Sequence, residues 1–179
     1  MILESQFRFI QVMTHEHRIK HGCNAFTYSD GEGLLELAKT FKPKRVLELG
    51  TALGYTACCL AATGDKCFVD TIEADKEHIK IARDNIARVG LEERIKIHEG
   101  DFIDVLKLLP GDYCMIFFDG LAPKRSLLMR LHNKLRIGGV LICANLSFAE
   151  GGCQELLDDK TYWTPVGQLE GGSTRAVKK

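Results

Sequence analysis

The chain has 179 residues and a mass of 20.0 kDa, which suits one domain and is short for two. Hydrophobic residues make up 45% and charged residues 27%, a composition that excludes disordered, collagen-like and coiled-coil chains. Lys and Arg total 24, as do Asp and Glu, so the net charge is zero. This balance argues against a partner that is held mainly through phosphates.

Targeting signals and cysteine usage bear on the compartment. No apolar run approaches the roughly 20 residues that cross a bilayer, and the N-terminus lacks the basic segment of a signal peptide. The seven cysteines contain no C-x-x-C pair, and Cys67, Cys114 and Cys143 sit inside apolar runs, as reduced core thiols do. We therefore expect a cytoplasmic protein without a membrane partner.

Short apolar runs alternate with amphipathic stretches along the chain. Residues 2–20 and 33–41 are predicted helices, and Pro43 follows the second. Helices are also predicted after Gly54, over 75–89 with Asp75 as N-cap, and over 127–135. The apolar runs have strand length, and most are nearly continuous, as in parallel strands that are buried on both faces. They cover residues 45–49, 67–72, 94–98, 113–118 and 140–143.

The C-terminal part changes style. Residues 161–166 and 173–177 read as two strands of an antiparallel hairpin at a sheet edge. The whole pattern predicts an α/β fold. Its doubly wound, Rossmann-like sheet is mostly parallel and seven-stranded, with an antiparallel C-terminal hairpin and helices on both faces.

The end of the first strand carries the clearest ligand signal. Glu48 precedes Gly50, which allows a tight turn, and Gly54, which allows close approach of a ligand or helix. An ordinary strand-to-helix turn with two glycines is the alternative. A dinucleotide fingerprint would need glycine where Ala52 stands, so the loop favours a ligand without phosphate, such as S-adenosylmethionine.

Acidic residues follow the next two strands. Glu73 is placed to accept both ribose hydroxyls of an adenosine cofactor, Asp101 to accept from the adenine amino group, and Phe102 to pack beside the ring. Each acid alone also fits a helix N-terminus or a solvated loop. Together with the Gly50 loop they follow three consecutive strands, whose carboxyl ends share one ligand crevice.

These motifs resemble the class I S-adenosylmethionine-dependent methyltransferases, and within them the catechol/caffeoyl-CoA O-methyltransferase group and its bacterial members. The resemblance runs from about Tyr28 to Lys178 and rests on segments 28–35, 45–56, 71–75 and 81–86 with Gly138 and Gly139. It implies one methyltransferase domain over 1–179, with a helical extension over 1–27 and a cofactor-binding core over 28–179. The implied cofactor residues are Glu48, Gly50, Thr51, Gly54, Tyr55, Glu73, Ala74, Asp101, Phe102 and Asp119.

The group binds a divalent metal through an Asp after strand four and an Asp-Asn pair after strand five, with a nearby Lys as base. Asp119 matches the first position, but Ala144 and Asn145 stand at the pair, so one carboxylate is absent. Asp119 and Asn145 make a poor magnesium site, which leaves metal dependence open. By resemblance, Asp119 and Lys124 are the candidate catalytic residues.

The resemblance implies in-line methyl transfer to the hydroxyl of a small, catechol-like acceptor. Two alternatives stay open: an RNA-modifying enzyme that acts on tRNA, and a binding protein that has lost catalysis. His15, His17 and His21 are interpreted as a solvated helix face, because no Cys or carboxylate completes a recognisable metal-binding set. A homodimer through the N-terminal helix or the edge hairpin is also left undecided.

Overall fold

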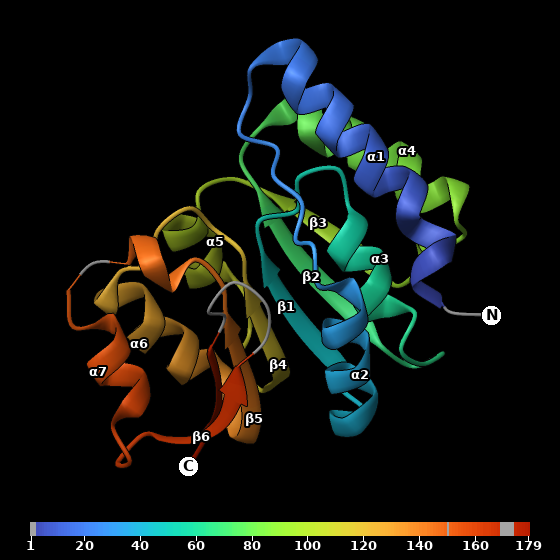
Figure 1. Cartoon of the computed structure of the whole chain (residues 1–179). Helices are drawn as coiled ribbons and strands as arrows, with labels where there is room; N and C mark the ends of the chain where they lie inside the picture. Colours follow the sequence, from blue (N-terminus) through green and yellow to red (C-terminus); the bar gives the residue numbers. More distant parts are fainter. Residues whose placement is uncertain (1–2, 150, 169–173) are drawn as a thin grey trace.

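Strands and helices alternate through most of the chain in a computed structural model that describes residues 3–149, 151–168 and 174–179 (Figure 1). The helices are α1 (Leu3–His21), α2 (Gly31–Phe41), α3 (Tyr55–Ala61), α4 (Lys76–Arg88), α5 (Phe102–Leu108), α6 (Arg125–Lys134) and α7 (Cys153–Asp158), with the short 3-10 helix η1 (Leu146–Phe148). The strands are β1 (Arg45–Leu49), β2 (Phe68–Glu73), β3 (Ile95–Glu99), β4 (Tyr113–Phe118), β5 (Leu135–Cys143), β6 (Trp163–Gln168) and β7 (Thr174–Lys178).

The strands form one seven-stranded sheet in the order β3-β2-β1-β4-β5-β7-β6. Strands β1 to β5 pair in parallel, whereas β7 lies antiparallel between β5 and β6. This confirms the predicted doubly wound sheet with an antiparallel C-terminal pair. The expected hairpin turn falls at residues 169–173, outside the described residues. The strand order reverses between β1 and β4: β2 and β3 follow on one side of β1, whereas β4 and β5 follow on the other. Parallel α/β sheets bind their ligands at such a point.

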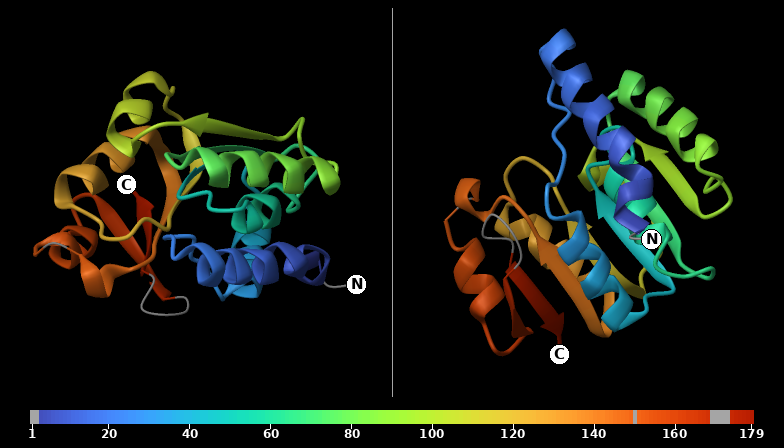
Figure 2. Two further views of the ribbon diagram at one scale, coloured as in Figure 1. Left: turned by 90° about the horizontal axis from the view of Figure 1, so that it is seen from above. Right: turned by 45° about the vertical axis from the view of Figure 1, so that its right-hand side comes forward.

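Helices cover both faces of the sheet, as Figures 1 and 2 show, and each face has its own apolar cluster. Side chains alternate along β1, so Val46 packs with helices α1 to α4, while Leu47 and Leu49 pack with α5 to α7. Strand β4 is buried along its whole length, which explains its continuous apolar sequence. Among the described residues, no helix has both the length and the hydropathy that a membrane span requires.

Three elements differ clearly from the sequence prediction in position or existence. Strand β5 begins at Leu135, five residues before the predicted start, because Gly138 and Gly139 lie inside the strand and do not precede it. Helices α5 and α7 were not predicted. They span 7 and 6 residues, too few to establish a helical repeat of apolar residues.

A buried acid joins β1, β2 and α3. The Glu48 side chain is inaccessible to solvent and accepts hydrogen bonds from the hydroxyls of Thr56 and, at 2.6 Å, Thr71. Burial raises the pKa of Glu48 to about 8, against the opposing effect of these two hydrogen bonds; the carboxylates of Asp119 and Glu73 also raise it. Glu48 therefore holds its proton to a higher pH than an exposed glutamate does.

We predict that Glu48 makes stability depend on pH. Between about pH 4.5 and 8 the folded chain holds a proton that the unfolded chain has released, so the free energy of unfolding falls as pH rises. The Glu48→Gln variant has no such titration. Its free energy of unfolding, relative to that of the native chain, should therefore rise by up to about 1.4 kcal/mol per pH unit in that window. Denaturant unfolding of both chains across this range measures the difference, and parallel pH profiles would contradict the prediction.

Candidate functional site

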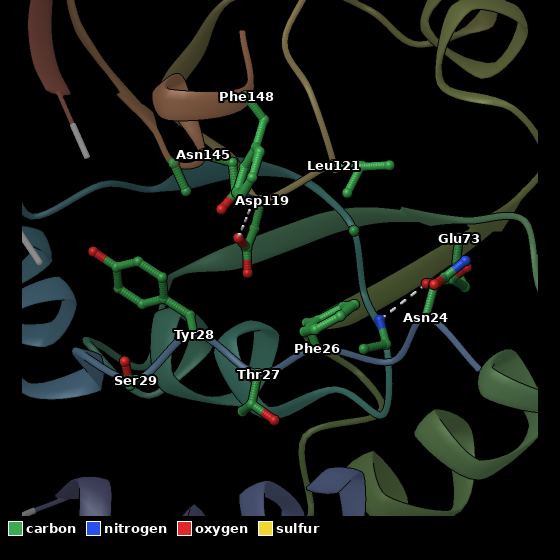
Figure 3. Close-up of a pocket in the computed structure, with 13 residues that line it drawn as sticks. Asn24, Phe26, Thr27, Tyr28, Ser29, Glu73, Asp119, Leu121, Asn145 and Phe148 are labelled. Atoms are coloured by element: carbon green, nitrogen blue, oxygen red, sulfur yellow. Dashed lines mark hydrogen bonds between the residues drawn. The ribbon is translucent and has the colours of Figure 1, made fainter. Parts of the chain in front are cut away.

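A cavity of about 400 Å³ lies at the carboxyl ends of β1, β2, β4 and β5 (Figure 3). It therefore stands at the reversal point of the sheet. The described residues that line it are Asn24, Phe26, Thr27, Tyr28, Ser29, Gly50, Ala52, Glu73, Asp119, Leu121, Ala144, Asn145 and Phe148.

The turn after β1 requires glycine at position 50. Gly50 has φ of +101°, and its N–H donates to the Ile72 carbonyl at 3.1 Å. A Cβ at this position would lie 3.0 Å from the carbonyl oxygen of Asp119, so any other residue would be strained in its backbone and crowded against that oxygen. The turn thus brings the backbone after β1 directly against the backbone after β4, at the edge of the cavity.

The rest of the glycine loop leads into α3. Gly54 has φ of +94° and is the N-cap of α3, and its backbone faces Ala82 and Ile86 of α4. Gly54 is thus placed for helix packing and is absent from the described cavity lining. Thr51 and Tyr55 line a small adjoining void of about 10 Å³, which Asp119 also borders.

The Glu73 carboxylate is fixed at the edge of the cavity by three backbone donors. Its Oε2 accepts from the N–H of Ala52 at 2.9 Å. Its Oε1 accepts from the N–H groups of Ala74 and Asp75 at 2.9 and 3.0 Å. Ala52 has φ of +45°, so the turn adopts a left-handed conformation at the residue that donates to Glu73. The position of this carboxylate is therefore set by the backbone of two loops (Figure 3).

The predicted adenine residues lie at the start of α5. Asp101 is exposed and caps α5, where its side chain accepts from the Ile103 N–H at 2.8 Å. The Phe102 ring packs edge-on against Phe118, with ring centroids 6.2 Å apart. Neither these residues nor Glu48 and Ala74 are among the described residues that line the cavity.

Asp119 and Asn145 meet at the ends of β4 and β5. The Asn145 amide donates to Asp119 Oδ1 at 3.3 Å and to the Gly120 carbonyl at 2.8 Å. Ala144 is buried and places a methyl group in the cavity wall. Because the amide presents its N–H₂ group to Asp119, this pair offers a single carboxylate to a cation. These donors do not fit the oxygen-rich shell that Mg²⁺ or Ca²⁺ requires.

Lys124 is the second candidate catalytic residue from the sequence. It is exposed at the N-cap position of α6 and is not among the described residues that line the cavity. Its side chain makes no cap hydrogen bond to the helix.

One wall of the cavity was not predicted. The segment 24–29, which joins α1 to α2, passes along the cavity, with Tyr28 packed edge-on against Phe117 at 5.1 Å between ring centroids. Phe26, Leu121 and Phe148 are 57%, 77% and 66% exposed and add apolar surface to the lining. The one sequence signal for this wall was Tyr28, because it begins segment 28–35, which carries the family resemblance.

The charge of the cavity is negative. Among the described residues that line it, Glu73 and Asp119 carry the charge, and no Lys, Arg or His is included. Such a site favours a cationic ligand and disfavours a phosphate-bearing one.

Known proteins resemble this chain in sequence. The sequence model of the O-methyltransferase family matches residues 9–162. The catechol O-methyltransferase of Niastella koreensis is 32% identical over 147 residues, which cover 78% of this chain and 65% of that protein. The catechol O-methyltransferase of Mycobacterium tuberculosis is 30% identical over 127 residues, or 68% of this chain and 57% of that protein. The matched region is thus less than two thirds of either relative.

Solved structures share the fold. The O-methyltransferase TomG from Streptomyces achromogenes, in complex with SAM, aligns with a TM-score of 0.79 and 21% identity over 95% of this chain and 89% of that chain. The Bacillus cereus O-methyltransferase, in complex with SAH, aligns with a TM-score of 0.78 and 22% identity over 95% and 91%. With the family model covering most of its length, the chain belongs to the O-methyltransferase family.

Proposed function

We propose that this protein is an S-adenosylmethionine-dependent methyltransferase that methylates a hydroxyl group of a small, catechol-like acceptor. The observation that carries the proposal is the Glu73 carboxylate, which three backbone N–H groups fix in the same cavity as Asp119. The catechol O-methyltransferases among the relatives, and the SAM and SAH complexes among the related structures, support the same reaction.

The residues of the cavity suit this cofactor. Glu73 keeps acceptor capacity for the ribose hydroxyls, while Gly50, Thr51 and Tyr55 would border the methionine part. Gly54 would act indirectly, through the packing of α3 against α4. Asp101 and Phe102, at the start of α5 and outside the described cavity lining, would hold the adenine together with Ala74. Bound S-adenosylmethionine supplies a methyl group on a cationic sulfonium, which the negative charge of Glu73 and Asp119 favours. Glu48 would act as a positioning residue, because it holds the hydroxyls of Thr56 and Thr71 through hydrogen bonds.

The acceptor would lie against the apolar part of the lining. Phe26, Leu121 and Phe148 provide exposed apolar surface that an aromatic ring can cover, which also excludes water from the reacting atoms. Asp119 is the carboxylate there that can orient the hydroxyl and take its proton. We assign no step to a divalent metal, because the Asp119 and Asn145 donors do not fit one.

The Glu73→Ala variant tests the cofactor site. Removing the carboxylate deletes its hydrogen bonds to a ribose, so we expect S-adenosylmethionine to bind about ten- to a hundredfold more weakly in calorimetry. Glu99→Ala is the matched control, since Glu99 ends the neighbouring strand β3 and pairs with Lys76 at 3.6 Å outside the cavity. Equal affinity in both variants, or no binding by the folded native chain, would overturn the proposal.

The Asp119→Asn variant tests the proton acceptor. We expect kcat with a catechol to fall by about a hundredfold or more, with cofactor affinity changed far less. Asp104→Asn on α5, an exposed carboxylate paired with Lys107 at 2.7 Å, should leave both quantities unchanged. Transfer to tRNA transcripts and not to catechols would refute the small-molecule acceptor. Cofactor binding without any transfer would instead support the binding-protein alternative.

The Ala144→Asp variant tests the missing carboxylate. A second acid beside Asp119 should create a weak Mg²⁺ site, with a Kd of about millimolar by calorimetry. Ala144→Asn is nearly the same size without the charge and should bind no Mg²⁺. Tight Mg²⁺ binding by the native chain would show that our view of its donor set is wrong.

A further inference from the structure

Helix α1 lies beside α4, as Figures 1 and 2 show. Three side chains of metal-ligating type come together near the start of α4, and none of them belongs to the described cavity lining. His17 comes from the last turns of α1, Cys23 follows the helix end, and His78 belongs to the first turn of α4. Their candidate ligand atoms all lie within 4.8 Å of one another. We propose that His17, Cys23 and His78 bind a zinc-class transition-metal ion.

His78 supplies the independent observation. It is 5% exposed, and its Nε2 is buried without a hydrogen-bond partner in the described part of the chain. The nearest carboxylate oxygens are those of Asp75, 3.9 Å from Nε2, and of Glu73, 4.0 Å from Nδ1, both beyond hydrogen-bond distance. A buried polar atom without a partner is destabilising, and metal coordination at this imidazole would compensate for it.

The donor types select the class of ion. Imidazole nitrogen and thiolate sulfur are ligands for Zn²⁺ and similar transition metals, whereas Mg²⁺ and Ca²⁺ take oxygen. Zinc is tetrahedral in proteins, so these three ligands leave one position that water can fill.

A second grouping, formed by His17, His21 and Glu77, is less suitable. The rings of His17 and His21 are stacked, with centroids 4.4 Å apart and an interplanar angle of 22°. Ring-nitrogen lone pairs lie in the ring planes, so two stacked imidazoles direct them side by side and not toward one ion. His21 and Glu77 are also exposed, so water competes with an ion for these two side chains.

The ion would connect two parts of the fold that serve the cavity. Cys23 directly precedes segment 24–29 of the cavity wall, and His78 lies 4.0 Å from the Glu73 carboxylate. Metal binding would therefore fasten α1 and the start of this wall to α4. The proposal concerns residues outside the described cavity lining and is independent of the methyl-transfer reaction.

Titration of the native chain with Co²⁺, followed by competition with Zn²⁺, tests the site. A thiolate-to-cobalt charge-transfer absorption reports Cys23 directly, because Cys58, Cys59, Cys67, Cys114, Cys143 and Cys153 are buried. We expect saturable binding of one ion per chain, loss of this absorption in Cys23→Ser, and at least about tenfold weaker binding in His17→Ala. Zn²⁺ should also raise the Tm of the native chain and not that of Cys23→Ser.

His15→Ala is the matched control, since His15 is exposed on the same helix and belongs to neither grouping. It should bind as the native chain does. His78→Asn is read after the two milder variants, with folding checked by circular dichroism. Native-like affinity in Cys23→Ser, or no thiolate absorption in the native chain, would overturn the proposal. No cofactor is present in these titrations, so their outcome is separate from that of the methyltransferase assays.

Discussion

The carbonyl oxygen of Asp119 would lie 3.0 Å from a Cβ on Gly50, so the backbones after β1 and β4 approach each other closely. This close approach ties the loop after β1 to the loop after β4, and two backbone hydrogen bonds reinforce it. The N–H of Asp119 donates to the Leu49 carbonyl at 3.0 Å, and the N–H of Gly50 donates to the Ile72 carbonyl at 3.1 Å. Three strand ends are thereby locked together, and the cavity, the Glu73 carboxylate and Asp119 all take their positions from that junction.

The strands that the sequence predicts best are the ones buried on both faces. The predicted strands 45–49 and 113–118 coincide with β1 and β4. A continuous apolar run between polar residues defines both ends of a buried strand. Glu73 and the Asp75 cap were also found from local pattern, since strand ends and helix starts are encoded within a few residues. The position of Glu73 at the end of a strand was therefore accessible to sequence reasoning.

The remaining parts depend on packing between distant segments. Phe26 and Phe148 reach the cavity through a long connection and a short 3-10 helix, neither of which carries a periodic signal. The meeting of His17 with His78 depends on how α1 lies across α4. From sequence alone His17 reads as part of a polar helix face, because its partners are supplied by a different helix and by a residue beyond the end of its own.

The distribution of cysteines has a practical consequence. Six of the seven thiols are buried, five of them in the two apolar clusters, while Cys23 is partly accessible just after the end of α1. A water-soluble alkylating reagent should therefore modify the native chain at one position, and the other six should react as their layers open. The order in which those six become alkylated would map local unfolding of the sheet from within, without any introduced label.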